Sequence, residues 1–327
     1  MHPPHRRPPH VGPVSAILVS WNSARTLGKC LESLAGQTRQ PAEIFVVDNA
    51  SGDASRDIAK GFSQITVIEN QQNVGFAPAV NQAWKLSKEP WIFLLNPDVV
   101  LDKFYLARLL AACEFRDTVG MGQGKLLRMN PEGVPLDPPV LDSTGIEWKS
   151  FGAFFMDRGG GKSAKEEIYE EPGEIFGPCA AAALYRREMI EQASWDRQIF
   201  DEEFFAYCED VDLAWRGRRA GWTGFYEPSA IAWHVRGGSN LASPRLEQLL
   251  YRNRLWVLAK NASASELLRF SPGWLSFEAA KFLQAMTTKS YLRPALVERI
   301  KGWKRMRAKR GLPPKRLPKE TAAGATP

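Results

Sequence analysis

The chain has 327 residues, of which 44% are hydrophobic and 24% are charged. This composition is typical of a globular protein and excludes a mainly disordered chain. The net charge is +7, and no apolar stretch reaches the roughly 20 residues that span a bilayer, so we expect neither a transmembrane anchor nor secretion. The four cysteines lie far apart without the spacing of a metal site, which favours a reducing, cytoplasmic location.

The first part of the chain alternates between strand and helix patterns. After a proline- and histidine-rich leader at 1–13, which we expect to be flexible, apolar runs predict four strands and the segments between them predict three helices. The expected strands are 14–20, 43–48, 65–70 and 91–95, and the expected helices are 26–37, 54–61 and 76–87. Such alternation predicts an α/β fold with a parallel sheet covered by helices on both faces.

The pattern is less regular after Asp102. A helix over about 102–115 is followed by a region interrupted by Gly and Pro, which we expect to form strands or a long loop. Further on, we expect a strand that runs into a helix near 176–190, a second helix that begins near Glu209, and two short strands at 223–228 and 230–235. These predictions give a catalytic domain at 14–240, with a nucleotide-binding half at about 14–125 and an acceptor half at about 126–240.

The C-terminal part is predicted to be helical and basic over 241–310, followed by a disordered tail at 311–327. Between Arg293 and Lys319 there are eleven Lys or Arg and one acid, an excess of +10, so the rest of the chain sums to 7 − 10 = −3. Because anionic lipid attracts such segments, this region could dock on a membrane, and a solvated helical face is the alternative. The sequence pI of about 9.2 also suggests nucleic-acid binding. We expect no nucleic-acid partner, however, because the excess charge is confined to one end.

Polar residues follow the predicted strands at their carboxyl ends, where open α/β sheets bind ligands. Each could be an ordinary turn or cap residue, but their succession at one edge favours a site. Asp48 ends an apolar strand, so its carboxylate needs a donor such as a nucleobase N–H or a ribose hydroxyl. Asp98 follows Pro97 on a rigid turn, where a carboxylate can hold Mg²⁺ or Mn²⁺ against a diphosphate.

A second set of candidates lies in the segment YCEDVDLAW. Glu209 and Asp210 fall at the predicted start of a helix, which favours carboxylates for electrostatic reasons alone. Aromatic residues surround them, so the segment could also supply a general base beside a sugar ring; they are Phe200, Phe204, Phe205, Tyr207 and Trp215. His234 ends a short apolar strand before Arg236 and a Gly-Gly turn, where it could contact a metal or phosphate or serve only a structural role.

Six segments in this order resemble the inverting family 2 glycosyltransferases, which have the GT-A fold. They are ILVSWNSARTLGKCLESL, VVDNASGD, NVGFAPAVNQA, LLNPDV, FFAYCEDVDLAWRGRRAGW and WHVRGGS. The resemblance covers roughly 14–260 and is strongest to a rhamnosyltransferase-like branch that builds bacterial polysaccharide and cell-wall linkers.

The resemblance implies a role for each candidate residue. The implied donor-binding residues are Ser20, Asn22, Asp48, Asn73, Gly75, Asn81 and Asn96. Apart from the resemblance, Arg236 and the Gly237–Gly238 hinge suggest a loop that closes over the diphosphate, with Arg236 as a further donor contact. Asn96 and Asp98 fall where the family has its DxD metal motif, so the first acid is here an amide and Asp98 is the main ligand. Asp210, beside Glu209, matches the general base, and His234 matches a position that contacts metal or diphosphate.

We therefore expect a metal-dependent inverting glycosyltransferase of cell-wall or surface polysaccharide synthesis. Its donor would be a dTDP- or UDP-sugar, with L-rhamnose as the transferred sugar, and its acceptor a glycan or a polyprenyl-diphosphate-linked sugar. The expected location is the cytoplasm, with peripheral contact at the inner face of the membrane. The alternatives are a relative that binds sugar nucleotide without transferring it and, from another class, a nucleic-acid-binding protein.

Overall fold

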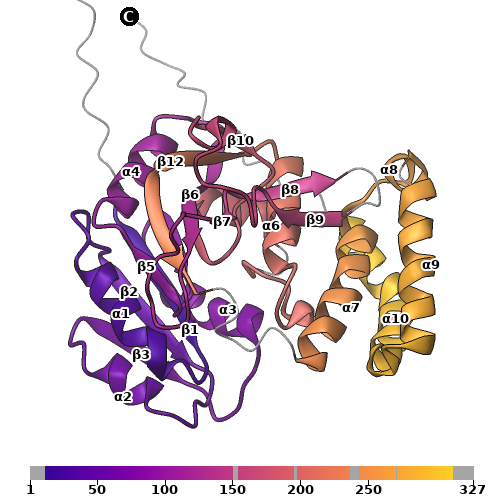
Figure 1. The fold of residues 1–327 in the computed structure, drawn as a ribbon, viewed down its shortest axis with the longest axis horizontal. Coiled ribbons are helices and arrows are strands. Elements are labelled where there is room, and N and C mark those ends of the chain that lie inside the picture. Colours follow the sequence, from indigo (N-terminus) through magenta and orange to yellow (C-terminus); the bar gives the residue numbers. More distant parts are fainter. Residues whose placement is uncertain (1–11, 150–153, 195–196, 236–242, 270, 312–327) are drawn as a thin grey trace, which may run out of the picture.

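The computed structural model describes residues 12–149, 154–194, 197–235, 243–269 and 271–311 (Figure 1). The strands are β1 (Val14–Ser20), β2 (Glu43–Asp48), β3 (Ile65–Glu69), β4 (Trp91–Leu95), β5 (Val99–Leu101), β6 (Val119–Arg128), β7 (Leu141–Ser143), β8 (Ile146–Lys149), β9 (Phe154–Asp157), β10 (Gly173–Ile175), β11 (Ala182–Arg186) and β12 (Thr223–His234). The α-helices are α1 (Ala24–Ala35), α2 (Ser55–Lys60), α3 (Phe76–Leu86), α4 (Tyr105–Glu114), α5 (Arg187–Ala193), α6 (Glu209–Arg219), α7 (Pro244–Asn261), α8 (Ala264–Arg269), α9 (Ser271–Thr287) and α10 (Arg293–Ala308). Short 3-10 helices are η1 (Glu167–Tyr169), η2 (Glu202–Phe204), η3 (Ser290–Leu292) and η4 (Lys309–Gly311).

The main sheet has the strand order β10-β12-β6-β11-β4-β1-β2-β3. Strands β3, β2, β1 and β4 are parallel, and β11 joins them antiparallel to β4. The chain adds β2 and β3 on one side of β1 and then places β4 on the other side. The strand order therefore reverses at β1, and the carboxyl ends of β1 and β4 flank the crevice in which such sheets bind ligands.

Successive side chains of a strand point to opposite faces, and both faces of this sheet are covered. Ala16 and Leu18 pack with helices α1, α2 and α4 in one apolar cluster. Ile17 and Val19 pack with α3, α5 and α6 in a second cluster on the other face. The expected α/β arrangement with helices on both faces of the sheet is confirmed.

Two expectations need correction or completion. The two short strands expected at 223–228 and 230–235 are one strand, β12, whose register against β6 shifts between Glu227 and Ile231. Pro228 falls inside this irregularity, where its missing N–H breaks no ladder bond. The region after β6, for which strands or a loop were expected, forms β7 and the β8–β9 hairpin. Residues 1–11 of the expected leader and 312–327 of the expected tail lie outside the described residues.

The C-terminal segment is helical, as expected, and packs beside the sheet with α9 at its outer edge (Figure 1). Glu278 of α9 forms ion pairs with Arg254 of α7 and Arg299 of α10, which joins these three helices at their centre. None of the helices in the described part of the chain is both long and apolar enough to span a membrane.

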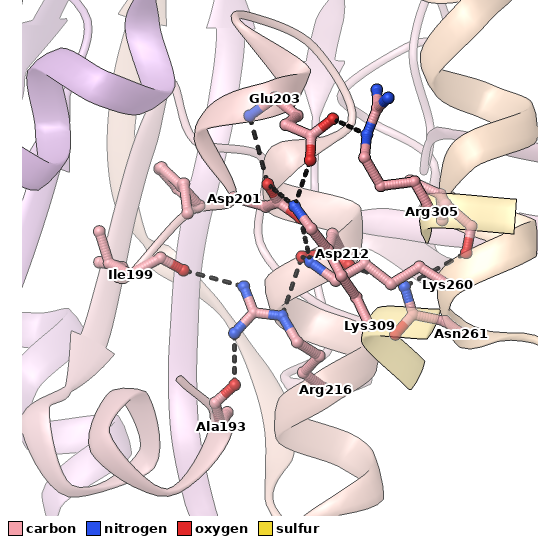
Figure 2. A network of polar contacts seen from close by, with 12 residues as sticks. Ala193, Ile199, Asp201, Glu203, Asp212, Arg216, Lys260, Asn261, Arg305 and Lys309 are labelled. Atoms are coloured by element: carbon pink, nitrogen blue, oxygen red, sulfur yellow. Dashed lines mark hydrogen bonds and ion pairs between the residues drawn. The ribbon is translucent and has the colours of Figure 1, made fainter. Parts of the chain in front are cut away.

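Buried ion pairs attach α6 to the C-terminal helices (Figure 2). The Lys260 Nζ of α7 lies 2.8 Å from Asp201 Oδ2 and 2.9 Å from Asp212 Oδ2, and all three side chains are at most 3% exposed. Arg216 Nε lies 2.8 Å from Asp212 Oδ2 within α6, and Lys309 Nζ lies 2.7 Å from Asp201 Oδ1. Because each buried carboxylate has at least two cationic partners, the network fixes α6 against α7 and η4.

We expect Lys260→Met to lower the free energy of unfolding by about 3–5 kcal/mol, because it leaves two buried carboxylates short of a partner. Burial raises the pKa of Asp212, but the charges of Lys260 and Arg216 lower it to about 2. Since the folded-state pKa lies below the unfolded value, the stabilisation exists above pH 4 and is lost as the pH falls toward 2. Denaturant unfolding from pH 2 to 7 measures both effects. The exposed α10 variant Lys301→Met is the matched control, and equal stability of the two variants at pH 7 would contradict the expectation.

Candidate active site

Two buried oxygen atoms without partners lie side by side where β1 and β2 end. Ser20 and Asp48 are paired in register, and both are at most 1% exposed. Asp48 Oδ2 accepts a hydrogen bond of 3.0 Å from the Ser51 N–H, whereas Asp48 Oδ1 and Ser20 Oγ have no hydrogen-bond partner. Buried polar atoms are nearly always paired, so these two atoms identify a place where a polar ligand would satisfy them.

Asn22 joins the loops that follow these two strands. Its Oδ1 accepts a hydrogen bond of 2.8 Å from the Gly52 N–H, and its own N–H donates to Ser51 Oγ over 3.0 Å. The residue has a φ of 52°, which asparagine tolerates better than most side chains. Asn22 therefore shapes the rim of the site, and its contact with a nucleoside stays a prediction.

The loop after β3 approaches the segment before α6. Asn73 Oδ1 accepts a hydrogen bond of 2.9 Å from the Gly75 N–H, and Gly75 has a φ of 98°. A Cβ at Gly75 would lie 2.6 Å from Phe205 Cδ2, so glycine is required for this close approach. Asn81 is fully buried and exchanges hydrogen bonds of 2.8 and 3.1 Å with the backbone of Phe200. Asn81 thus fixes the neighbouring backbone, and its place in the donor pocket stays a prediction.

The second group lies around His234, at the end of β12. Its Nε2 lies 3.3 Å from Asp98 Oδ1, and its Nδ1 lies 2.7 Å from Asp142 Oδ2. Burial lowers the pKa of His234, but the hydrogen bonds and charges of the two carboxylates outweigh it and raise the pKa to about 10. The structure thus brings the two predicted metal ligands, Asp98 and His234, into contact.

This group can contribute to a metal site but does not complete one. Asp98 Oδ1 is buried, and its one ion-pair partner within the described residues is His234 Nε2 at 3.3 Å. Within the described residues, no group of three or more His, Cys, Asp or Glu side chains is arranged to hold an ion. Asp98 and His234 therefore fit an ion that takes its remaining ligands from a diphosphate and water, as Mg²⁺ and Mn²⁺ commonly do. Because an imidazole binds metal through a deprotonated nitrogen, binding of the ion would release the Nε2 proton that the raised pKa of His234 otherwise retains. The Asn96 N–H donates to Ala181 O, the Asn96 carbonyl accepts from the Val99 N–H, and the residue is half-buried. Its contact with the donor stays a prediction.

Glu209 and Asp210 form the first residues of α6. Asp210 Oδ1 accepts a hydrogen bond of 2.8 Å from the Val211 N–H, and Oδ2 accepts one of 3.2 Å from the Ala180 N–H. Burial raises the pKa of Asp210 to about 6, with a further contribution from the charge of Asp157. Burial and the charge of Asp210 raise the pKa of Glu209 well above its usual value, and Glu209 Oε2 has no hydrogen-bond partner. Asp210 is thus oriented by backbone donors and has a pKa suited to a base near neutral pH.

The segment before β11 links the two groups. The Ala180 N–H donates to Asp210, and the carbonyl of the next residue, Ala181, accepts a hydrogen bond of 2.8 Å from the Asn96 N–H, two residues before Asp98. Burial raises the pKa of the nearby Cys179 thiol, and the charges of Asp157, Asp210 and Asp142 raise it further. Of the aromatic residues predicted beside the acids, Trp215 packs edge-on against Trp148, whereas Phe200 and Phe204 are fully buried in the core.

Arg236, predicted to contact the diphosphate, lies outside the described residues. Asp142 and Asp157 were not predicted as site residues. Asp142 is 92 positions from His234 in the sequence, within a short strand of a Gly- and Pro-interrupted region. Its only sequence signal is an acid that follows two apolar residues, Val140 and Leu141, which alone does not identify a partner.

Curated proteins with similar sequences are glycosyltransferases. The chain is 28% identical over 248 residues to the N-acetylglucosaminyl-diphospho-decaprenol L-rhamnosyltransferase of Mycobacterium tuberculosis, covering 70% of this chain and 78% of that protein. It is 30% identical over 148 residues to a PGL/p-HBAD biosynthesis glycosyltransferase of Mycobacterium bovis, covering 44% of this chain and 52% of that protein.

Two solved structures share the fold. GalNAc-T7, solved with UDP, GalNAc and Mn²⁺, superposes with a TM-score of 0.57 at 16% identity over 77% of this chain and 48% of that one. Residues 1–349 of S. aureus TarS, solved with UDP, give a TM-score of 0.52 at 17% identity over 90% of both chains. The expected GT-A fold is confirmed. The family described as "Glycosyl transferase family 2" matches residues 15–193, more than half of the chain, and this protein belongs to that family.

Proposed function

We propose that the protein transfers L-rhamnose, with inversion, from a dTDP- or UDP-linked donor to a polyprenyl-diphosphate-linked or glycan acceptor of cell-wall or surface polysaccharide synthesis. The observation that carries the proposal is Asp210, a carboxylate with a raised pKa that accepts two backbone hydrogen bonds, one of them from Ala180 beside the residue that bonds the Asn96–Asp98 turn. The choice of sugar and acceptor is supported by the L-rhamnosyltransferase relative, whose name gives a lipid-linked N-acetylglucosaminyl diphosphate.

The proposed reaction is a single displacement at the anomeric carbon. Asp210 accepts the proton of the acceptor hydroxyl as its oxygen forms a bond to that carbon from the face opposite the diphosphate. The bond from the anomeric carbon to the diphosphate oxygen breaks, and the nucleoside diphosphate leaves with the electron pair. Ser20 and Asp48 bind the nucleoside through the two unpaired oxygen atoms at the ends of β1 and β2.

Asp98 and His234 would hold the divalent cation. Mg²⁺ or Mn²⁺ bound there would neutralise charge that develops on the diphosphate oxygens. Asp142 accepts the Nδ1–H of His234 in this arrangement, which would leave Nε2 directed at the ion.

We also propose that the outer face of α9 contacts an anionic membrane, where a polyprenyl-linked acceptor would be found. This face carries exposed apolar residues at helical spacing and no charged residue; its large members are Leu275, Phe282, Leu283 and Met286. The only acid of α9, Glu278, is paired inside the helical bundle. An apolar helix face within a segment of positive charge matches the surface of an anionic bilayer.

We expect Asp210→Asn to lower kcat by about 10²- to 10⁴-fold with the affinity for donor nucleotide unchanged. The rate of the unmodified enzyme should fall about tenfold per pH unit below pH 6, because Asp210 then binds a proton. Release of nucleoside diphosphate from dTDP-, UDP- and GDP-sugars, with N-acetylglucosaminyl-diphospho-polyprenol as acceptor, measures both.

Glu209→Gln is the matched control and should have a smaller effect, since the raised pKa of Glu209 favours its protonated form. Full activity of Asp210→Asn would refute the assignment, and binding of nucleotide without transfer would identify a non-catalytic relative.

We expect Mn²⁺ to strengthen dTDP or UDP binding to the unmodified protein and to have no such effect on Asp98→Ala. Asp142→Asn should weaken Mn²⁺ binding by about 10- to 100-fold, because it removes the carboxylate that orients His234. Isothermal titration calorimetry with and without Mn²⁺ measures both effects, and the metal-free titration controls for loss of the nucleotide pocket. Equal enhancement by Mn²⁺ in Asp98→Ala would contradict the metal site.

We expect the double variant Leu275→Ser, Leu283→Ser to bind phosphatidylglycerol vesicles at least tenfold more weakly than the unmodified protein. Leu250→Ser is the control, because Leu250 is an exposed leucine on α7. Substitutions are preferable to removal of the C-terminus, since Lys309 is an ion-pair partner of the buried Asp201. Co-sedimentation with vesicles measures binding. If the double variant still binds vesicles but no longer forms a dimer that the unmodified protein forms, a second copy of the chain, and not a membrane, covers this face.

A further inference from the structure

The backbone that leads into α6 is held in an unfavourable conformation. Phe205, Tyr207 and Cys208 have φ values of 66°, 71° and 67°, a region that bulky side chains rarely adopt. Phe205 has a ψ of −63°, and the Ala206 N–H donates to Phe204 O over 2.8 Å, which makes this segment a strained γ-turn. We refer to residues 205–208 as the base turn, because Asp210 follows two positions later. Such strain persists only where the surroundings hold the backbone in place.

One side chain of α7 supplies much of that support. Asn253 is fully buried, and its Nδ2 lies 2.9 Å from Phe204 O, 2.8 Å from Ala206 O and 2.8 Å from Tyr207 O. Its Oδ1 accepts a hydrogen bond of 2.9 Å from Arg252 Nε, which orients the amide so that Nδ2 faces the turn. Arg252 Nη2 adds a hydrogen bond of 3.1 Å to Phe204 O.

The base turn also contacts the donor side of the site. Phe205 O accepts a hydrogen bond of 3.0 Å from the Ala77 N–H at the start of α3, and the Phe205 ring packs on Gly75. The turn is thus held between the loop after β3 and helix α7. Asn253 lies beyond residues 15–193, the part of the chain that matches the family.

We propose that Asn253 is a positioning residue for the transfer: its amide holds the base turn in the conformation that aims Asp210 at the acceptor hydroxyl. This inference rests on the proposed role of Asp210 and extends the catalytic unit into the C-terminal helices. A misplacement of about 1 Å at a reacting group lowers rates by about 100-fold, so a turn that relaxes would slow transfer without altering the nucleotide pocket.

The test compares Asn253→Leu and Asn253→Asp with Val257→Ala. Leucine removes both polar groups, and aspartate keeps the shape and the bond to Arg252 but places an oxygen against three carbonyl oxygens. Val257→Ala removes buried apolar atoms from the same helix without removing a hydrogen bond to the turn, so it matches the loss of packing. Hydrogen exchange of the amides of 204–211 reports the turn itself. The kcat and KM for dTDP-L-rhamnose and N-acetylglucosaminyl-diphospho-polyprenol report transfer.

In both Asn253 variants, the amide hydrogens of the base turn should exchange with solvent faster than in the unmodified protein. The kcat should fall by about 10- to 100-fold with an unchanged KM for the donor. The melting temperatures should be close to that of Val257→Ala. Unchanged exchange in both variants would overturn the role of Asn253, and so would faster exchange with an unchanged kcat. An inactive unmodified enzyme that binds dTDP would count against the proposed function, whereas the exchange result would still decide whether Asn253 holds the turn.

Discussion

The structure depends on how the first turn of α6 is fixed, because this turn carries the proposed base and begins in strained backbone. Lys260 pairs with Asp201, before the base turn, and with Asp212, in the first turn of α6, so a single buried ammonium group holds both ends of the segment that contains Asp210. Buried charges tolerate little displacement, since any separation leaves a desolvated carboxylate unpaired. The C-terminal helices therefore hold the segment that carries Asp210, although they lie outside the part of the chain that matches the family.

The rest of the candidate site lies at the carboxyl ends of the parallel strands. Parallel strands end at the same edge, so Ser20 and Asp48 meet there, and Asp98 follows β4 across the point where the strand order reverses. The unpaired oxygens of Ser20 and Asp48 are buried before any ligand binds. A site of this kind needs little reorganisation when the ligand arrives, because its polar groups are already oriented by the sheet.

Much of this arrangement could be predicted from the sequence, and the limits have physical causes. Alternating apolar runs identify β1 to β4, and the polar residues at their ends follow from the geometry of parallel sheets. The pairing of Asp142 with His234 could not be predicted, because it joins residues 92 positions apart through an irregular region. The role of Asn253 could not be predicted from the sequence either, because the sequence does not distinguish a buried asparagine on a helix from a solvent-exposed one. Pro228 indicated a break between two strands, but a local register shift accommodates it within β12.

The stereochemistry of the product tests the central claim most directly, because a single displacement with Asp210 as base must invert the anomeric carbon. Product formed from the nucleotide sugar that the enzyme accepts can be analysed by NMR for the configuration of the new linkage. The account predicts the anomer opposite to that of the donor. A product that retains the donor configuration would contradict it, since retention requires a different course of reaction at this site.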